Sequence, residues 1–212
     1  MRRLFLLFDN RSGRAGTVCV FQTDPGLGLD GVTSLAWLTK RVEPTTRVAF
    51  TWEVAYEFVW YDSGALARGD ACVASQLRPA SLAGCNQIAL THGEHGFSFG
   101  EPTRGPEAGS LFIEPDGTIP VDRVAVGLGM AGRGALVVPA QPNLTYRFST
   151  PDPEYWITFG ELQPGEPLDP KALAAPVARV AFPDNVWAMS ATLDERGRWS
   201  VRPTDGLGRR EP

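Results

Sequence analysis

The sequence has few residues of the kinds that most often build metal or redox sites. It contains two histidines and three cysteines in 212 residues. No two cysteines have a Cys-x-x-Cys spacing, which argues against a structural zinc site. Because Cys19, Cys72 and Cys85 are odd in number and widely separated, we expect reduced, buried thiols and no disulfide framework. We expect no cofactor.

Long apolar runs and an excess of positive charge are also absent. No window approaches the roughly 18 consecutive apolar residues of a membrane-spanning helix. The run from Leu4 to Phe8 stops at Asp9, short of the roughly 7–15 apolar residues of a secretory signal. We therefore expect it to be the first strand of a cytoplasmic protein with no membrane partner. The net charge is −4 without a basic stripe, so nucleic acid is not an expected partner either.

Glycine and proline are abundant, with 23 and 18 copies. Because both residues interrupt regular structure, they indicate many short elements joined by tight turns. The clearest periodicity is in RVAFTWEVAYEFVW, where every second residue from Val48 to Trp60 is apolar. This alternation predicts extended structure with one buried face. Since the run exceeds the usual strand of about 5–6 residues, we expect a bulge or bend near Ala55, where a strand passes from one sheet to another.

Further short strands are predicted along the whole chain. They cover residues 17–22, 86–91, 96–99, 110–114, 124–129, 134–138, 144–148, 155–159, 177–182, 187–193 and 199–202. Only residues 32–40 and 170–174 have helical character. We therefore predict an all-β fold, a single-domain antiparallel β-sandwich or closed barrel with short helical turns over residues 1–203. Residues 204–212 are expected to form a flexible C-terminal tail.

The stretch VGLGMAGRG, from Val126 to Gly134, contains a literal Gly-x-Gly-x-x-Gly. A dinucleotide-binding loop needs a helix after these glycines and an acidic residue at the end of a second strand. Here the glycines run into the proline-stopped ALVVP, and the acidic residue at the expected spacing, Asp152, lies in a Pro-Asp-Pro turn. We predict instead two glycine-rich strands joined near residues 131–133, where absent side chains let a neighbouring aromatic residue approach.

Both histidines lie in the segment THGEHG. Imidazoles bind metals well, and Glu94 or Glu101 could complete a set of two histidines and one carboxylate with His92 and His95. The spacing does not enforce such a site, because residues i and i+3 of a strand point to opposite faces. The strands predicted on both sides make the segment a hairpin connection with solvated histidines, which we favour over a metal or catalytic role.

Glu53 and Glu57 share the polar face of the alternating run. Glycoside hydrolysis needs two carboxylates roughly 5–5.5 or 6.5–9.5 Å apart. Residues four apart on one strand have Cα atoms about 13 Å apart, so these two cannot form the pair unaided. One of them is a candidate general base if that face lines a barrel interior. A solvated outer face is the interpretation we favour.

Aromatic residues supply the candidate ligand contacts. In PDPEYWITFG, the residues Tyr155, Ile157 and Phe159 alternate as a core face should, and Trp156 lies on the opposite face. We favour core packing for Tyr155 but keep it, with Trp156 and Trp60, as a candidate ligand-binding residue, because amphipathic rings suit a pocket rim. The catalytic candidates are Glu53, Glu57, His92, His95 and Tyr155.

Four segments have unusual and fairly specific motifs: CVFQTDPGLGLDGVTSLAWLTKRVEPTTRVAFTWEVAYEFVW, GSLFIEPDGTIP, AVGLGMAG and VVPAQPNLTYRFSTPDPEYWITFGE. They resemble the bacterial RhiA family, rhizosphere-expressed proteins first described in rhizobia, and the similarity runs from about Thr17 to Pro203. The resemblance implies a soluble cytoplasmic protein under population-density control during plant association. It implies no catalytic residues.

Three classes of function fit these observations. We favour a non-catalytic protein that binds a small molecule or a partner in bacterial signalling or host interaction, because aromatic residues are plentiful and no catalytic set stands out. The alternative is a cofactor-independent enzyme, a cyclase or isomerase of secondary metabolism, whose apolar cavity orients a substrate without a sequence motif. A self-associating structural protein is the third, so a homo-oligomer also fits the sequence.

Overall fold

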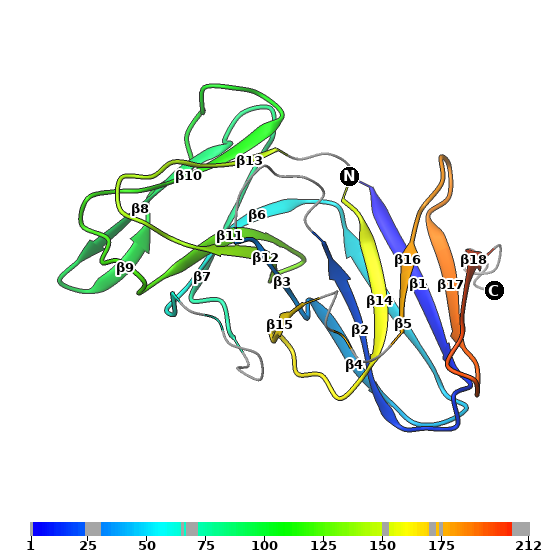
Figure 1. The fold of residues 1–212 in the computed structure, drawn as a ribbon. Coiled ribbons are helices and arrows are strands. Elements are labelled where there is room, and N and C mark those ends of the chain that lie inside the picture. The colour runs from blue at the N-terminus through cyan, green and yellow to red at the C-terminus, as the bar shows by residue number, and fades with distance from the viewer. Residues whose placement is uncertain are drawn as a thin grey trace.

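The computed structural model describes residues 2–23, 31–64, 66, 72–149, 153–169, 173 and 176–204. Within these residues the chain forms eighteen β-strands and no helix. The described residues therefore contain no helix that is long and apolar enough to cross a membrane. The strands form four open sheets, which pack face to face in two pairs (Figure 1). The all-β prediction is therefore confirmed as a sandwich-like fold, and the closed-barrel alternative is wrong for the described strands.

The first sandwich has two four-stranded sheets. One has the order β18 (Trp199–Pro203), β17 (Ala188–Leu193), β1 (Arg3–Asn10) and β5 (Arg47–Glu53), and the other has β16 (Val177–Val180), β14 (Tyr155–Gly160), β2 (Gly16–Gln22) and β4 (Leu38–Val42). Alternate residues of each strand point between the sheets, as the two-residue period of a strand requires. Leu6, Phe8, Val20 and Ile157 are fully buried in this first core.

The second sandwich has a six-stranded and a four-stranded sheet. The larger has the order β15 (Pro167–Leu168), β3 (Thr33–Leu35), β12 (Arg133–Pro139), β11 (Ala125–Met130), β6 (Tyr56–Tyr61) and β7 (Gln76–Pro79), and the smaller has β13 (Tyr146–Ser149), β10 (Ser110–Pro115), β8 (Gln87–Gly93) and β9 (Gly96–Phe99). Phe58, Ile88, Leu111 and Phe148 are fully buried between them. The described part of the chain thus builds two separate cores.

The strand pairs are mostly antiparallel, as predicted, but two are parallel. β1 pairs with β17, and β8 pairs with β10. Neither pair is joined by a hairpin, so no tight turn fixes the relative direction of its strands. The antiparallel prediction is therefore incomplete.

The alternating run forms two strands that belong to different sandwiches. β5 pairs with β1, and β6 pairs with β11, with the break at residues 54–55. The apolar face of the run buries Phe50 and Trp52 in the first core and Phe58 and Trp60 in the second. The predicted bend near Ala55 and the passage between sheets are both confirmed.

The helical turn predicted over residues 32–40 is wrong. β3 and β4 occupy this segment, and they pair with β12 and β2 in different sandwiches. Burial in two sheets outweighs the weak helical propensity of the segment. The other helical turn, over residues 170–174, lies outside the described residues except for Leu173, as do Asp152 and the tail beyond Thr204.

The stretch VGLGMAGRG forms the β11–β12 hairpin, as predicted. Its turn residues Ala131 and Gly132 have φ angles of 56° and 72°, which are characteristic of a type I′ turn. A Cβ atom at Gly134 would overlap the hydroxyl group of Tyr61 on β6. Because Gly134 has no side chain, the aromatic side chain of Tyr61 can pack against its backbone, as predicted for a neighbouring aromatic residue.

The tip of this hairpin also belongs to the first core. Met130 and Ala135 are buried there, among residues of the first sandwich. The indole Nε1 of Trp37 donates a hydrogen bond to the carbonyl oxygen of Met130 at 2.7 Å. The β11–β12 hairpin therefore links the two sandwiches.

The three cysteines differ in exposure. Cys19 is buried, Cys72 is half-buried and Cys85 is exposed. Burial raises the pKa of the Cys19 thiol far above its ordinary value. The expectation of buried thiols is confirmed for Cys19 and wrong for Cys85.

Candidate functional site

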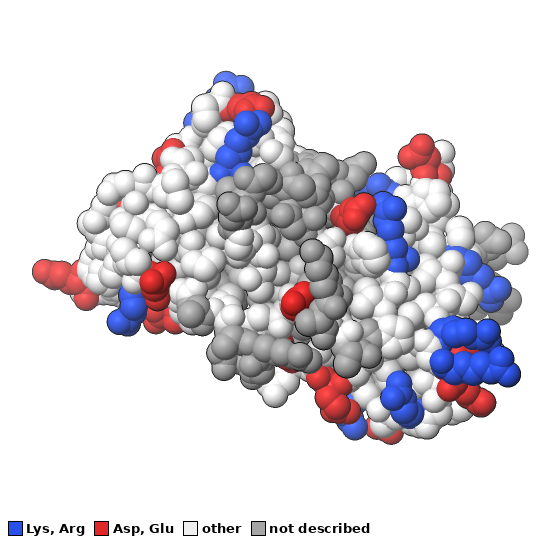
Figure 2. Space-filling view, viewed as in Figure 1, with Lys and Arg blue, Asp and Glu red and all other residues white. Residues whose placement is uncertain are grey.

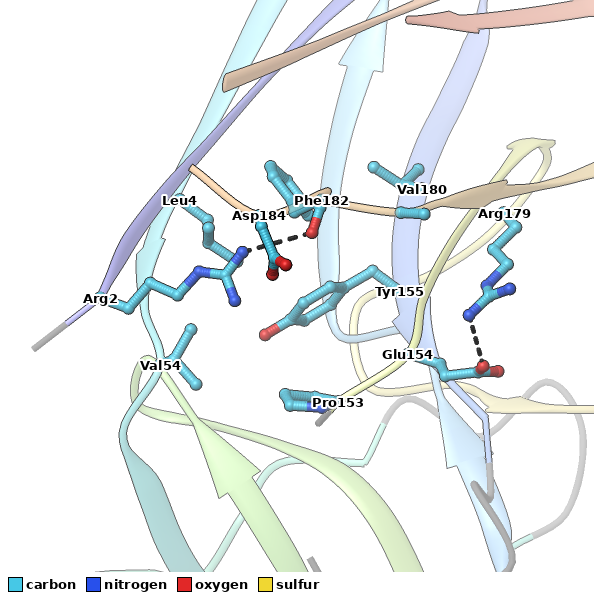
Figure 3. A pocket seen from close by; sticks show the side chains of 11 residues that line it. Arg2, Leu4, Val54, Pro153, Glu154, Tyr155, Arg179, Val180, Phe182 and Asp184 are labelled. Carbon is cyan, nitrogen blue, oxygen red and sulfur yellow. Dashed lines mark hydrogen bonds and ion pairs between the residues drawn. The ribbon is translucent and has the colours of Figure 1, made fainter. Parts of the chain in front are cut away.

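A pocket of about 410 Å³ opens at one end of the first sandwich (Figure 3). Four strand ends meet there: the beginnings of β1 and β14, and the ends of β5 and β16. Leu4, Val54 and Pro153 contribute apolar surface to its wall. The volume lies within the range of roughly 300–1,000 Å³ that is usual for small-molecule sites.

An aromatic cluster forms one side of the pocket. Tyr155 and Phe182 line it, with their ring centroids 6.0 Å apart. Trp52 packs edge-on against both rings, at 5.1 and 5.8 Å, and Trp37 stacks on Tyr155 at 6.0 Å. Tyr155 is 3% exposed, and its hydroxyl group lies 3.7 Å from the sulfur of Met130. The predicted core packing of Tyr155 is confirmed, and it holds the ring rigidly at the pocket.

The two arginines that line the pocket differ in their partners. Arg179 Nη2 forms an ion pair with Glu154 Oε1 at 2.7 Å. The guanidinium of Arg2 lies 5.1 Å from the ring centroid of Trp187, and its Nη2 donates a long 3.4 Å hydrogen bond to the Phe182 carbonyl oxygen. Arg2 Nε is buried and has no acceptor. Within the described structure, no ion pair neutralises the charge of Arg2.

Trp52 packs against Tyr155 and Phe182 without lining the pocket itself, and it has an unsatisfied donor in the first core. Its Nε1 is buried and has no hydrogen-bond partner among the described residues. A buried donor without an acceptor costs roughly 1–3 kcal/mol. Asp184 lies on the exposed rim of the pocket, and no salt bridge joins it to Arg2 in the part of the chain that is described. The pocket therefore combines rigid aromatic rings with one arginine, Arg2, that has no ion-pair partner among the described residues.

The structure places Glu53 and Glu57 in different sandwiches. Glu53 is exposed at the end of β5, opposite Arg3 of β1. Glu57 lies on β6, and its Oε2 accepts a hydrogen bond from the backbone amide of Gly132 at 2.8 Å. The premise of a barrel interior does not apply to either residue. The Glu57 carboxylate instead stabilises the turn of the β11–β12 hairpin.

His92 and His95 lie in the β8–β9 hairpin, as predicted. His95 is exposed in the turn, whereas His92 is half-buried with its ring 4.6 Å from that of Phe97, its partner across the strands. The prediction of solvated histidines is thus right for His95 and wrong for His92. The described residues, which include Glu94 and Glu101, contain no group of three His, Cys, Asp or Glu side chains that could hold a metal ion.

Trp156 and Trp60 do not share the pocket with Tyr155. Trp156 lies on the opposite face of β14, where it packs against a small cluster that contains Cys19 and Phe21. Trp60 is 8% exposed in the second core, and its Nε1 donates a hydrogen bond to Gln76 Oε1 at 3.0 Å. Of the three aromatic candidates, only Tyr155 lines this pocket.

The sequence also contains a Gly-x-Ser-x-Gly match, GFSFG, which begins at Gly96. A nucleophile elbow needs this motif at a sharp turn from a strand to a helix. Here it starts on β9, where Ser98 is exposed and pairs with Thr91 of β8, while its hydroxyl donates to the neighbouring Phe99 carbonyl oxygen. The motif therefore lacks the geometry of an activated serine.

Sequence reasoning missed Arg2, Phe182 and Asp184. Phe182 ends a predicted strand, but no local pattern distinguishes the other two residues. The three residues meet because β1 begins and β16 ends at the same edge of the first sandwich.

Charged side chains on the face in Figure 2 lie in small groups separated by uncharged residues. Basic and acidic groups occur near each other, as in the pair of Arg11 and Arg47 that both contact Asp9 Oδ2, at 3.0 and 3.2 Å. The expectation that nucleic acid is not a partner stays a prediction.

A family model described as RhiA matches residues 3–204. The chain belongs to the RhiA family. Protein RhiA of Rhizobium leguminosarum bv. viciae is 34% identical over 201 residues, which cover 93% of this chain and 85% of that protein. No solved structure matches the chain. The match to the RhiA family confirms the resemblance and includes every residue of the pocket except Arg2.

Proposed function

We propose that this member of the RhiA family is a non-catalytic protein that binds a small molecule in the pocket of the first sandwich. The observation that carries the proposal is the rigid pair of rings, Tyr155 and Phe182, beside charged rim groups in a space of about 410 Å³. Its lining combines apolar side chains with four charged ones, Arg2, Glu154, Arg179 and Asp184, and ligand sites use such polar groups to fix the orientation of the ligand. We place this function in the cytoplasm, in bacterial signalling or host interaction, as the family resemblance implies.

The other catalytic candidates do not converge on this pocket. Glu53 is on an exposed outer face, and Glu57, His92 and His95 belong to the second sandwich. The proposal therefore assigns Tyr155 to ligand contact.

Native mass spectrometry of the protein purified from its own host tests the proposal. We expect a retained small molecule, and we expect Ala181→Trp, which places a large ring at the exposed rim of the pocket, to abolish its retention. Ala89→Trp is the matched control, because Ala89 is exposed on β8 of the second sandwich. Absence of any ligand, or equal retention by Ala181→Trp and the wild type, would contradict the proposal.

A further inference from the structure

We infer, on the basis of the proposed binding function, that the ligand class is a small carboxylate with a flat apolar body. The carboxylate binds the guanidinium of Arg2, and the flat body lies against Tyr155 and Phe182. Figure 3 shows that the side chain of Arg2, just before β1, and that of Tyr155, at the start of β14, reach toward the same space.

The hydrogen-bonding state of Arg2 carries the first step. A guanidinium has five N–H donors. Arg2 uses its Nη2 in one long hydrogen bond to Phe182, and its buried Nε has no acceptor. The ring of Trp187 lies against the guanidinium at 5.1 Å, which orients the planar group by a cation–π contact. Because Nε is enclosed by protein atoms, a ligand reaches the guanidinium through its Nη groups, and a carboxylate fits this edge best because it accepts two parallel hydrogen bonds.

The neighbouring polar groups favour an anionic ligand. Besides Arg2 and Arg179, the charged side chains that line the pocket are Glu154 and Asp184. Glu154, the one acidic side chain at the β14 end of the pocket, already forms an ion pair with Arg179. Asp184 on the rim is exposed and is the carboxylate of this chain that competes with a ligand for Arg2.

The aromatic side of the pocket favours a flat body. Tyr155 and Phe182 are held by edge-on contacts with Trp52, so their rings cannot turn aside without disturbing the first core. Val54 and Pro153 add apolar surface on the adjacent wall. An aromatic or similarly planar body fills such a rigid space better than a branched one.

Three matched probes test the inference: 2-naphthoate, the neutral 2-naphthalenemethanol and the cationic 2-naphthylmethylammonium. Affinities are measured by calorimetry on the full chain at low ionic strength. We expect 2-naphthoate to bind at least about tenfold more tightly than the other two, because a charge-assisted hydrogen bond is the stronger kind. We expect Arg2→Gln to lower the affinity for 2-naphthoate to that of the neutral probe, and Arg2→Lys, which keeps the charge without the fork, to fall between.

Arg14→Gln is the matched control, because Arg14 is exposed at the β1–β2 turn and its guanidinium makes no contact with a described acidic group. It should leave all three affinities unchanged, and a thermal melt of each variant confirms folding. Equal binding of the charged and neutral probes, or equal binding of 2-naphthoate by Arg2→Gln and the wild type, overturns the carboxylate class while the pocket remains a binding site. Failure of all three probes at millimolar concentration, together with no ligand retained from the host, overturns the proposed function as well.

Discussion

The two sandwiches each bury a tryptophan at an equivalent position, and the two indole groups differ in their hydrogen bonding. Trp52 and Trp60 lie on the same apolar face of one alternating run, and both are buried. In the second sandwich, Trp60 donates its indole hydrogen to Gln76, which β7 supplies from the edge of the sheet. In the first sandwich, the indole donor of Trp52 has no acceptor among the described residues.

The buried tyrosines of the two sandwiches also have different partners. In the second sandwich, the Tyr146 hydroxyl donates to the Pro139 carbonyl oxygen at 2.9 Å and accepts from the Gln141 amide at 2.8 Å. In the first sandwich, the Tyr155 hydroxyl lies 3.7 Å from the sulfur of Met130, and Tyr155 lines the pocket together with Arg2. The indole of Trp60 and the hydroxyl of Tyr146 are therefore satisfied within the second sandwich, where Arg78 Nε is a buried donor without an acceptor, whereas both Trp52 Nε1 and Arg2 Nε lack acceptors at the end of the first core. The predictions below test this contrast and the hairpin that links the two sandwiches.

Trp37→Ala should have the largest effect. Trp37 is 1% exposed in the first core, and its removal also leaves the Met130 carbonyl oxygen of the hairpin without its donor. We expect the free energy of unfolding to fall by about 3–5 kcal/mol in urea denaturation followed by circular dichroism. Phe148→Ala, at a fully buried position of the second core, is the comparison variant. A smaller loss for Trp37→Ala than for Phe148→Ala would contradict the role of Trp37 as the link.

Gly134→Ala should come next. The added Cβ overlaps the Tyr61 hydroxyl, so we expect a loss of about 1–3 kcal/mol in the same assay. In a Tyr61→Phe background the loss should be smaller, because the overlapping oxygen is gone, and a double-mutant cycle measures the difference. Gly93→Ala in the β8–β9 hairpin is the control, since its Cβ would have no described atom within 4 Å. Additive effects of Gly134→Ala and Tyr61→Phe would show that the two residues do not touch.

Glu57→Gln should destabilise the hairpin by about 1 kcal/mol, because a neutral amide oxygen is a weaker acceptor for the Gly132 amide than a carboxylate. Glu53→Gln, at an exposed strand end, should change the unfolding free energy by less than about 0.5 kcal/mol. Chemical denaturation of both variants at neutral pH makes the comparison. Equal effects would remove the structural role that we assign to Glu57.

Ionisation of the buried Tyr61 hydroxyl should lower stability only at high pH. Burial raises its pKa well above the ordinary value of about 10, so the unfolded chain loses this proton first. The stabilisation is therefore complete below about pH 10 and is lost as pH rises toward the folded-state pKa. We expect the unfolding free energy to decline above about pH 10, and less steeply in Tyr61→Phe. Identical declines in the variant and the wild type would show that other groups cause the alkaline loss.

Much of the fold was predictable, because the signals that specify it are local. The alternation of apolar residues from Val48 to Trp60 predicted both strands and the bend between them. The proline-stopped sequence after Gly134 predicted a hairpin in place of a dinucleotide loop. By contrast, β3 and β4 are short segments whose burial depends on partners in two different sheets, so their residues carry no clear period. The partial burial of His92 escaped prediction for a similar reason, since it depends on the register with Phe97.

The sequence by itself determined the all-β class, most strand positions, the bend at residues 54–55 and the glycine-rich hairpin, because side-chain period and turn chemistry act over a few residues. Only the tertiary structure decided where the pocket lies. The parallel pairing of β1 with β17 brings Arg2 beside Phe182 and Trp187, about 180 positions away along the chain. Such pairings depend on strand order and register across the whole sheet, and no local pattern encodes them.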